Sequence, residues 1–230
     1  MKGPIWFLLV FASLILLLPL TIKINQLRHH GLLNRKEIFN TVDLILLVIS
    51  TLGILVSLLW DFNYLNYKVP IEYRNWKTIT LNDFRGLKKP WETMDGDKNF
   101  AFISSSIKVS RTKNRIEIKS LFHPCRSYVF DRKLFSKQML THEMYHFHIT
   151  EYCARLMRRE VQDSINSNGK IDLRKIKNKI LETEDQLQYQ YDDETYHSYV
   201  YNKQIEWQNK IDSLLLTLND FSSTILTVKK

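Results

Sequence analysis

Residues 142–146 read His-Glu-Met-Tyr-His, a complete H-E-x-x-H motif, in a stretch whose apolar spacing predicts a helix. Because residues four positions apart share one face of a helix, His142 and His146 can direct ring nitrogens at one metal ion. Glu143 then lies beside the ion, where a carboxylate can take a proton from a bound water molecule. The motif therefore predicts a zinc site (Zn2+) suited to hydrolysis.

The predicted helix carries one buried stripe, with residues at intervals of three and four. Its members are Phe135, Met139, His142, His146, Ile149, Cys153 and Leu156. A buried histidine needs a hydrogen-bond partner, and two stacked one turn apart need several. A shared metal ion satisfies both rings, whereas the alternative is a pair of core histidines bonded to backbone or carboxylate groups. We favour the metal ion.

A catalytic zinc ion normally has three protein ligands and an open position for water. Seven histidines are available in the chain. His148 points away from the metal face of the motif helix, and His29 and His30 lie far upstream. His123 ends a predicted strand and is possible, while His197, on the buried side of a later predicted helix, is better placed. From the residues alone the third ligand stays open.

Two apolar runs near the start of the chain predict a membrane hairpin. Residues 4–22 carry no charge, and residues 42–60 carry only Asp43. A run of this length forms about 28 Å of helix, which is enough to cross a hydrocarbon core. The first run could instead be a cleaved signal peptide, but no small-x-small cleavage site follows it. We therefore expect two transmembrane helices, through which the protein interacts with the lipid bilayer.

The charges between the two runs predict the orientation of the hairpin. Residues 23–41 hold four basic residues and one acidic residue, so this loop is expected in the cytoplasm. The rest of the chain then lies on the far side, as in a multi-pass protein of the bacterial inner membrane with a periplasmic or extracellular domain. Inversion or cleavage of the first run would instead place that domain in the cytoplasm.

Beyond the hairpin, we expect a membrane-proximal tether over residues 61–77 and one domain over residues 78–230. Predicted strands cover residues 78–81, 100–109 and 115–122, with a surface loop at 86–99 and a hairpin turn at 111–114. Predicted helices cover about 131–162, 172–189 with Asp172 as N-cap, and a third from about 194. The expected fold class is α+β.

Charge and cysteine content narrow the class of protein. Residues 61–230 hold 28 basic and 22 acidic residues, a net charge of +6, and nothing in them resembles a nucleic-acid module. Cys125 and Cys153 are the two cysteines, and the spacing leaves open whether they form one disulfide or two separate buried thiols. We expect no nucleic-acid partner.

Two blocks of sequence resemble the bacterial family called domain of unknown function 922, which comprises predicted zinc-dependent proteases. They are HEMYHFHITEYCARLMRRE (142–160) and YDDETYHSYVYNKQIEWQNKI (191–211). Matching positions are His142, Glu143, His146, Phe147, Ile149, Glu151, Ala154, Arg155, Tyr191, Asp192, Thr195, His197, Gln204 and Trp207. The resemblance covers roughly residues 77–215. His148 replaces the usual Asp, and Ser198 replaces the usual Gly.

The resemblance implies a zincin-like domain, with a small antiparallel sheet, an active-site helix and two further helices. It implies His197 as third zinc ligand beside His142 and His146, and Glu143 as general base. A donor for the developing oxyanion would be Tyr191 or Tyr196. Three acidic residues could orient the imidazoles, with a solvated carboxylate or a helix cap as the alternative for each: Glu151, Asp192 and Glu194.

Motif and resemblance together predict a membrane-anchored zinc metallopeptidase that hydrolyses peptides or proteins. One alternative is a non-catalytic, membrane-anchored binding or scaffold protein with a structural zinc site. Another is a zinc amidase that acts on cell-wall material, because the same metal chemistry cleaves other amides. The substrate itself is not encoded in any motif.

Overall fold

The computed structural model describes residues 29, 45, 48–53, 55, 67–86, 101–133, 135–167 and 171–228. The chain divides into two compact units, Met1–Leu65 and Asn66–Lys230. In the first unit, the described residues are helical. The second unit is a mixed structure of helices and sheet and contains every site discussed below.

The predicted membrane hairpin, and with it the multi-pass inner-membrane location, is corrected by the structure. Within the part of the chain that is described, no helix combines the length and the apolar character that crossing a bilayer demands. A span needs about 20 consecutive apolar residues. Of run 42–60, only residues 45, 48–53 and 55 are described, and run 4–22 lies wholly outside the described residues.

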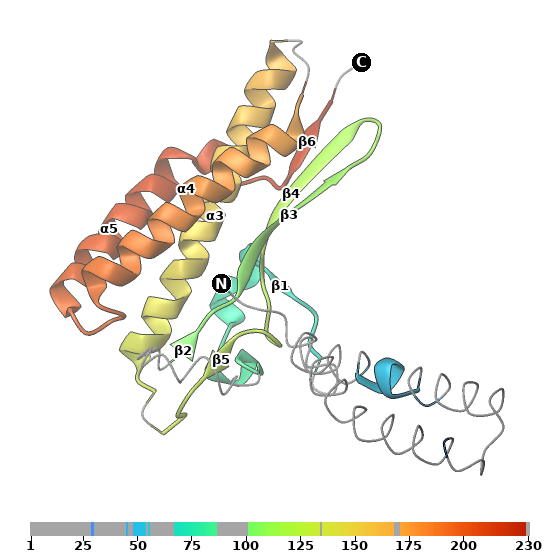
Figure 1. Ribbon diagram of the computed structural model, residues 1–230. Helices are drawn as coiled ribbons and strands as arrows, with labels where there is room; N and C mark the ends of the chain where they lie inside the picture. Colours follow the sequence, from blue (N-terminus) through green and yellow to red (C-terminus); the bar gives the residue numbers. More distant parts are fainter. Residues whose placement is uncertain are drawn as a thin grey trace. The chain divides into compact units, whose positions relative to one another are not determined.

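Four antiparallel strands form the main sheet of the second unit (Figure 1). They are β1 (Ile71–Glu72), β3 (Ser105–Arg111), β4 (Arg115–Phe122) and β6 (Ile225–Thr227). β4 lies in the centre, because β3 pairs along one side of it while β1 and β6 pair with it at either end of the other. A separate two-stranded sheet joins β2 (Ala101–Phe102) to β5 (Tyr128–Val129).

The long hairpin of β3 and β4 follows from the alternation in its second strand. Ile116, Ile118, Ser120 and Phe122 are buried on one face, and the residues between them are more exposed. The predicted strand 115–122 and its antiparallel partner are confirmed. The predicted strand 100–109 is divided, because β2 ends at Phe102 before β3 begins.

The predicted strand at residues 78–81 is wrong. Short 3-10 helices, η2 (Tyr73–Thr78) and η3 (Leu81–Asp83), occupy this region. The Asp83 carboxylate accepts hydrogen bonds from the backbone N–H and the hydroxyl of Thr80, at 2.8 and 3.0 Å. This capping box bends the chain out of an extended conformation. β1 lies within the predicted tether and pairs with β4. Residues 87–100, which include most of the predicted surface loop, lie outside the described residues.

Three helices pack together beside the sheet: α3 (Lys137–Asn166), α4 (Leu173–Thr195) and α5 (Tyr201–Thr217) (Figure 1). α3 contacts both β4 and the other two helices. The N-caps of α3 and α4 are polar: Ser136 accepts from the Met139 N–H, and Asp172 accepts from the Lys175 N–H, whereas the N-cap of α5 is Val200. Asp172 is thereby confirmed as the predicted cap.

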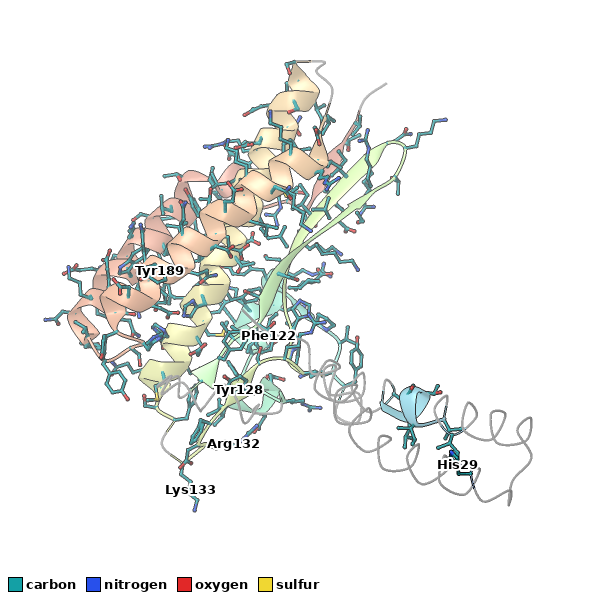
Figure 2. The ribbon with its side chains drawn as sticks, viewed as in Figure 1. His29, Phe122, Tyr128, Arg132, Lys133 and Tyr189 are labelled. Carbon is teal, nitrogen blue, oxygen red and sulfur yellow. The ribbon has the colours of Figure 1, made fainter. Side chains whose placement is uncertain are left out.

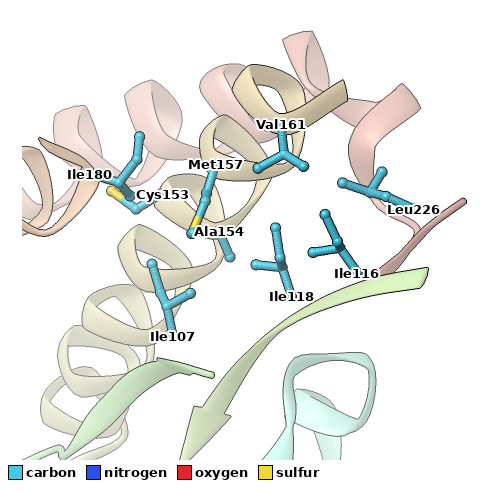
Figure 3. Packing of buried hydrophobic residues seen from close by; sticks show 9 residues of the cluster. All are labelled: Ile107, Ile116, Ile118, Cys153, Ala154, Met157, Val161, Ile180 and Leu226. Carbon is cyan, nitrogen blue, oxygen red and sulfur yellow. The ribbon is translucent and has the colours of Figure 1, made fainter. Parts of the chain in front are cut away.

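The principal core lies between α3 and the sheet (Figure 3). Its buried members are Ile107, Ile116, Ile118, Cys153, Ala154, Met157, Val161, Ile180 and Leu226. Removing this apolar surface from water is the main force that holds α3 against the hairpin. Cys125 and Cys153 are both buried and are not joined by a disulfide, which decides the open question of their pairing.

The third helix begins later than predicted, and this changes the setting of His197. α4 continues to Thr195, and α5 starts only at Tyr201. Between them, Tyr196, His197 and Ser198 have φ values of 48°, 51° and 78°. His197 therefore lies in a left-handed turn that joins two helices, and not on a helix.

Candidate metal centre

The H-E-x-x-H motif lies in the first half of α3 and brings its two histidines together as predicted. The Nε2 atoms of His142 and His146 are 3.2 Å apart. Their rings are nearly perpendicular, with centroids 4.9 Å apart. His142 is buried and His146 is partly buried, so both ring edges meet beside a cleft and not in bulk solvent.

Gln188 on α4 fixes the orientation of the His146 ring. His146 Nδ1 lies 2.5 Å from Gln188 Oε1, and Gln188 Nε2 donates to the His146 carbonyl oxygen at 3.0 Å. An amide oxygen can only accept, so the imidazole proton is on Nδ1. A metal ion bound at Nε2 would replace the proton that this nitrogen shares with the Asp192 carboxylate. No sequence signal marked Gln188.

Tyr191 packs against both histidines from the core side. Its ring stacks on His142 at 4.5 Å and meets His146 edge-on at 5.0 Å. The hydroxyl donates to the His142 carbonyl oxygen at 3.4 Å, and the side chain is wholly buried. Tyr191 thus supports the rings, and its hydroxyl does not face the cleft. Tyr196, the other predicted oxyanion donor, is exposed and packs near Tyr199.

The left-handed turn carries His197 back toward α3. The His197 N–H donates to the Asp192 carbonyl oxygen at 3.1 Å, which ends α4. Gln138, in the first turn of α3, donates from Nε2 to the Ser198 carbonyl oxygen at 2.8 Å. Two hydrogen bonds to separate elements therefore hold a backbone conformation that costs free energy for residues other than glycine.

Asp192 lies at the centre of the site, where the sequence predicted only a carboxylate that orients a ring. Its Oδ1 is 2.9 Å from His146 Nε2, 3.1 Å from His142 Nε2 and 3.3 Å from His197 Nδ1. Donor atoms of His142, Asp192 and His197 all lie within 4.8 Å of one another. The structure thus brings all three predicted ligands to one carboxylate oxygen.

The charges of this cluster shift the pKa values of its members in opposite directions. Burial lowers the pKa of His142 to about 4. Burial also opposes the charge on His146, but the nearby Asp192 carboxylate outweighs it and raises the His146 pKa to about 9. For Asp192, burial is outweighed by the three histidines, which hold its pKa far below the usual range. The carboxylate is therefore anionic at neutral pH.

Glu143, the predicted general base, is buried beside the two histidines and lines the cleft. Burial raises the pKa of its carboxyl to about 7, although His146 and a hydrogen bond from the Ile103 backbone act in the opposite sense. A carboxyl group with a pKa near neutrality can both accept and return a proton.

A cleft of about 510 Å³ opens onto these residues. Residues 101–107, which include β2 and the start of β3, form one wall, and α4 from Lys177 to Asp192 forms another. Within the described residues β3 pairs with β4 alone, so its other edge is available to the cleft. The outer face of α4, marked by Tyr189, points away from the sheet (Figure 2).

Other predicted candidates lie elsewhere. His123 Nε2 is bonded to Ser106 Oγ at 2.7 Å, and His148 Nδ1 is bonded to Tyr73 Oη at 2.7 Å. The Glu194 carboxylate accepts from Trp207 Nε1 at 2.9 Å. Glu151 is bonded to Ser120, Arg155 and Arg158 and so orients none of the three imidazoles. His29 belongs to the first unit, and His30 is outside the described residues.

The side chains of the cluster fit a zinc ion. Imidazole nitrogens and carboxylate oxygens are its ordinary ligands in proteins, together with thiolates. His142 Nδ1 is buried and has no hydrogen-bond partner among the described residues. The ring is held by its Nε2 side and by stacking on Tyr191.

Comparisons with protein-family models, with curated proteins and with solved structures found no match to this chain. The resemblance of residues 77–215 to the predicted zinc-dependent proteases stays a prediction.

Proposed function

We propose that this protein is a zinc-dependent hydrolase that cleaves peptide bonds. His142, His146 and His197 would hold the ion, and Glu143 would act as general base. The observation that carries the proposal is the meeting of three imidazole nitrogens around one point, with a buried carboxyl group beside it in an open cleft.

The chemistry divides between the ion and the chain. When bound, zinc supplies a Lewis acid that lowers the pKa of a water molecule and polarises a carbonyl group. Glu143 supplies the proton transfer: its carboxylate accepts a proton from the attacking water and returns it to the leaving amine. Burial raises the pKa of the Glu143 carboxyl above its usual value, which strengthens it as a base.

The shape of the cleft favours an extended polypeptide as substrate. The wall at residues 101–107 ends in the edge of β3, which carries backbone donors and acceptors along its length. An extended chain can pair with such an edge by β-augmentation. The histidines lie at the α3 side of this wall, so a peptide paired with β3 would pass the ion and Glu143.

The decisive experiment compares zinc content and peptide hydrolysis in the full chain and in Glu143→Gln. Removal of the base should leave zinc at one equivalent and lower hydrolysis by at least about 100-fold. Glu182→Gln, which alters an exposed carboxyl group on α4, is the matched control and should change neither quantity. A purified chain that takes up no zinc, or a Glu143→Gln variant of full activity, contradicts the proposal.

The third ligand needs its own variant. His197→Ala and His142→Ala should each reduce zinc affinity, because a nitrogen of each ring lies beside the same carboxylate oxygen, Asp192 Oδ1. Zinc that is lost from His142→Ala and fully retained by His197→Ala would exclude His197 as a ligand.

One observation favours a second function, a binding or scaffold protein with a structural zinc site. Structural zinc ions have four protein ligands, and Asp192 offers a fourth donor atom. Stoichiometric zinc, a fall in thermal stability after its removal, and no hydrolysis over a broad peptide panel would select this function.

A further inference from the structure

The spacing of the donor atoms places Asp192 among the ligands that one ion could have, because donor atoms of His142, Asp192 and His197 lie within 4.8 Å of one another and His146 Nε2 is 2.9 Å from Asp192 Oδ1. Tetrahedral zinc with bonds of 2.0–2.1 Å has ligand atoms about 3.3 Å apart. His142 Nε2 and His146 Nε2 are 3.2 Å apart. Asp192 Oδ1 is 2.9, 3.1 and 3.3 Å from the nitrogens of His146, His142 and His197. Asp192 therefore occupies a ligand position and not a place behind a ring.

Hydrogen bonding alone does not explain this arrangement. A carboxylate oxygen has two lone-pair sites, and three imidazole nitrogens surround Asp192 Oδ1. The Nε2 atoms of the motif pair are also only 3.2 Å apart. A cation among these atoms removes the crowding, because every lone pair can then point at the ion.

Asp192 and His197 lie close together at the C-terminal end of α4. Asp192 lies in the last turn of α4, and its carbonyl oxygen accepts the His197 N–H at 3.1 Å. The two side chains thus reach the motif helix from a single helix end. The Asp192 side chain is about a third exposed, so it lies on the cleft side of the cluster and has room to withdraw.

We propose that Asp192 is a fourth protein ligand that closes the coordination sphere of the ion in the resting protein. The inference rests on the proposed zinc site and adds a regulatory property to it. While Asp192 is bound, no position is open for water or for a substrate carbonyl. The site is latent until the carboxylate withdraws from the ion or the coordination number rises to five.

The test replaces zinc by Co²⁺ in the full chain and titrates azide while the visible absorption of the cobalt is recorded. Azide needs an open ligand position, so its apparent affinity falls in proportion to the fraction of open molecules. Asp192→Ala should bind azide at least about tenfold more tightly than the unaltered chain. It should also bind Co²⁺ and Zn²⁺ about 10- to 100-fold more weakly.

Two further variants keep the test decisive. Asp192→Asn retains the shape of the side chain and is a poor ligand, so it should follow Asp192→Ala even where the alanine variant folds badly. Asp193→Asn alters the exposed neighbour on α4 and should behave as the unaltered chain. Equal azide affinity in the unaltered chain and both Asp192 variants overturns the proposal, as does an unchanged affinity for metal.

Peptide hydrolysis, measured on the same zinc-loaded samples, separates the two proposals. Hydrolysis that is absent from the unaltered chain and from both Asp192 variants, together with an azide response that depends on Asp192, refutes the peptidase and retains the fourth ligand. Hydrolysis that requires Glu143, with azide binding equal in all variants, retains the peptidase and refutes the fourth ligand. A chain that takes up neither metal refutes both.

Discussion

Each imidazole on α3 is oriented by a different neighbour. His146 is held through its Nδ1 proton by Gln188, whereas His142 is held by stacking on Tyr191. His197 depends on the turn that carries it. A metal ion at this point would therefore meet rings that are already aligned, and the entropy of aligning them is lost during folding and not during metal binding.

The role of Gln188 can be tested by its replacement with leucine. Gln188→Leu removes the acceptor of the His146 Nδ1 proton and the donor to the His146 carbonyl oxygen. Neighbours that orient a ligand in this way contribute about 10- to 100-fold to metal affinity. We expect a loss of that size in a zinc competition assay with a chromophoric chelator.

The matched control for Gln188→Leu is Gln186→Leu, which alters an exposed position two residues away on α4. Its zinc affinity should equal that of the unaltered chain. Equal losses in the two variants would point to a general effect on the helix and would remove Gln188 from the metal centre.

At the scale of elements, the short turn between α4 and α5 determines where the third histidine lies. Three successive residues with positive φ are rare in a chain without glycine at those positions. The turn persists because Gln138 bonds the Ser198 carbonyl oxygen, and Gln204 Nε2 in turn bonds the Gln138 carbonyl oxygen. The start of α3 and the start of α5 are thus tied together beside the metal centre.

Ser198→Gly should stabilise the folded protein. Ser198 has a φ of 78°, and a left-handed conformation costs about 1–2 kcal/mol for a residue with a Cβ atom. Glycine avoids this cost but loses about 0.5–1 kcal/mol of chain entropy. We expect the free energy of unfolding to rise by up to about 1.5 kcal/mol in urea titrations.

Ser213→Gly is the control for the turn, because Ser213 lies within α5 and is exposed. Glycine in a helix interior should lower the free energy of unfolding by about 0.5 kcal/mol. If both substitutions destabilised the protein to the same degree, the turn would carry no strain at Ser198.

The sequence predicted those elements whose signals are local. The alternation over residues 115–122 and the cap at Asp172 were sufficient for β4 and for the start of α4. The turn at 196–198 was missed, because hydrogen bonds from a distant helix impose it against local preference. Asp192 was predicted to orient an imidazole, but its contact with all three histidines was not, since that contact follows from where α4 ends. Gln188 has no spacing that marks it.

At the scale of the whole unit, α3 joins the metal centre to the rest of the fold. Its second half carries Arg158, which is wholly buried and donates to Glu151 and to the carbonyl oxygens of Ile118 and Phe221. These bonds connect α3 to β4 and to the segment before β6. Breaking one member of such a buried network leaves an uncompensated charge, so the network fixes one arrangement of sheet and helix.

Acid should weaken the unit partly through Asp83, which lies in η3. Burial would raise the pKa of this carboxyl, but bonds from the Lys68 ammonium and from Thr80 outweigh it and hold the pKa below the usual value. The pKa of Asp83 is lower in the folded than in the unfolded protein. Its charge therefore stabilises the fold fully above the unfolded value of about 3.9, and this stabilisation is lost as pH falls through the folded value.

Asp83→Asn should therefore lower the free energy of unfolding by about 1–3 kcal/mol at pH 7. In urea titrations from pH 7 to pH 3, the difference between the two chains should stay constant down to about pH 5 and shrink below pH 4. A difference that is the same at pH 3 as at pH 7 would show that the Asp83 charge contributes nothing to the fold.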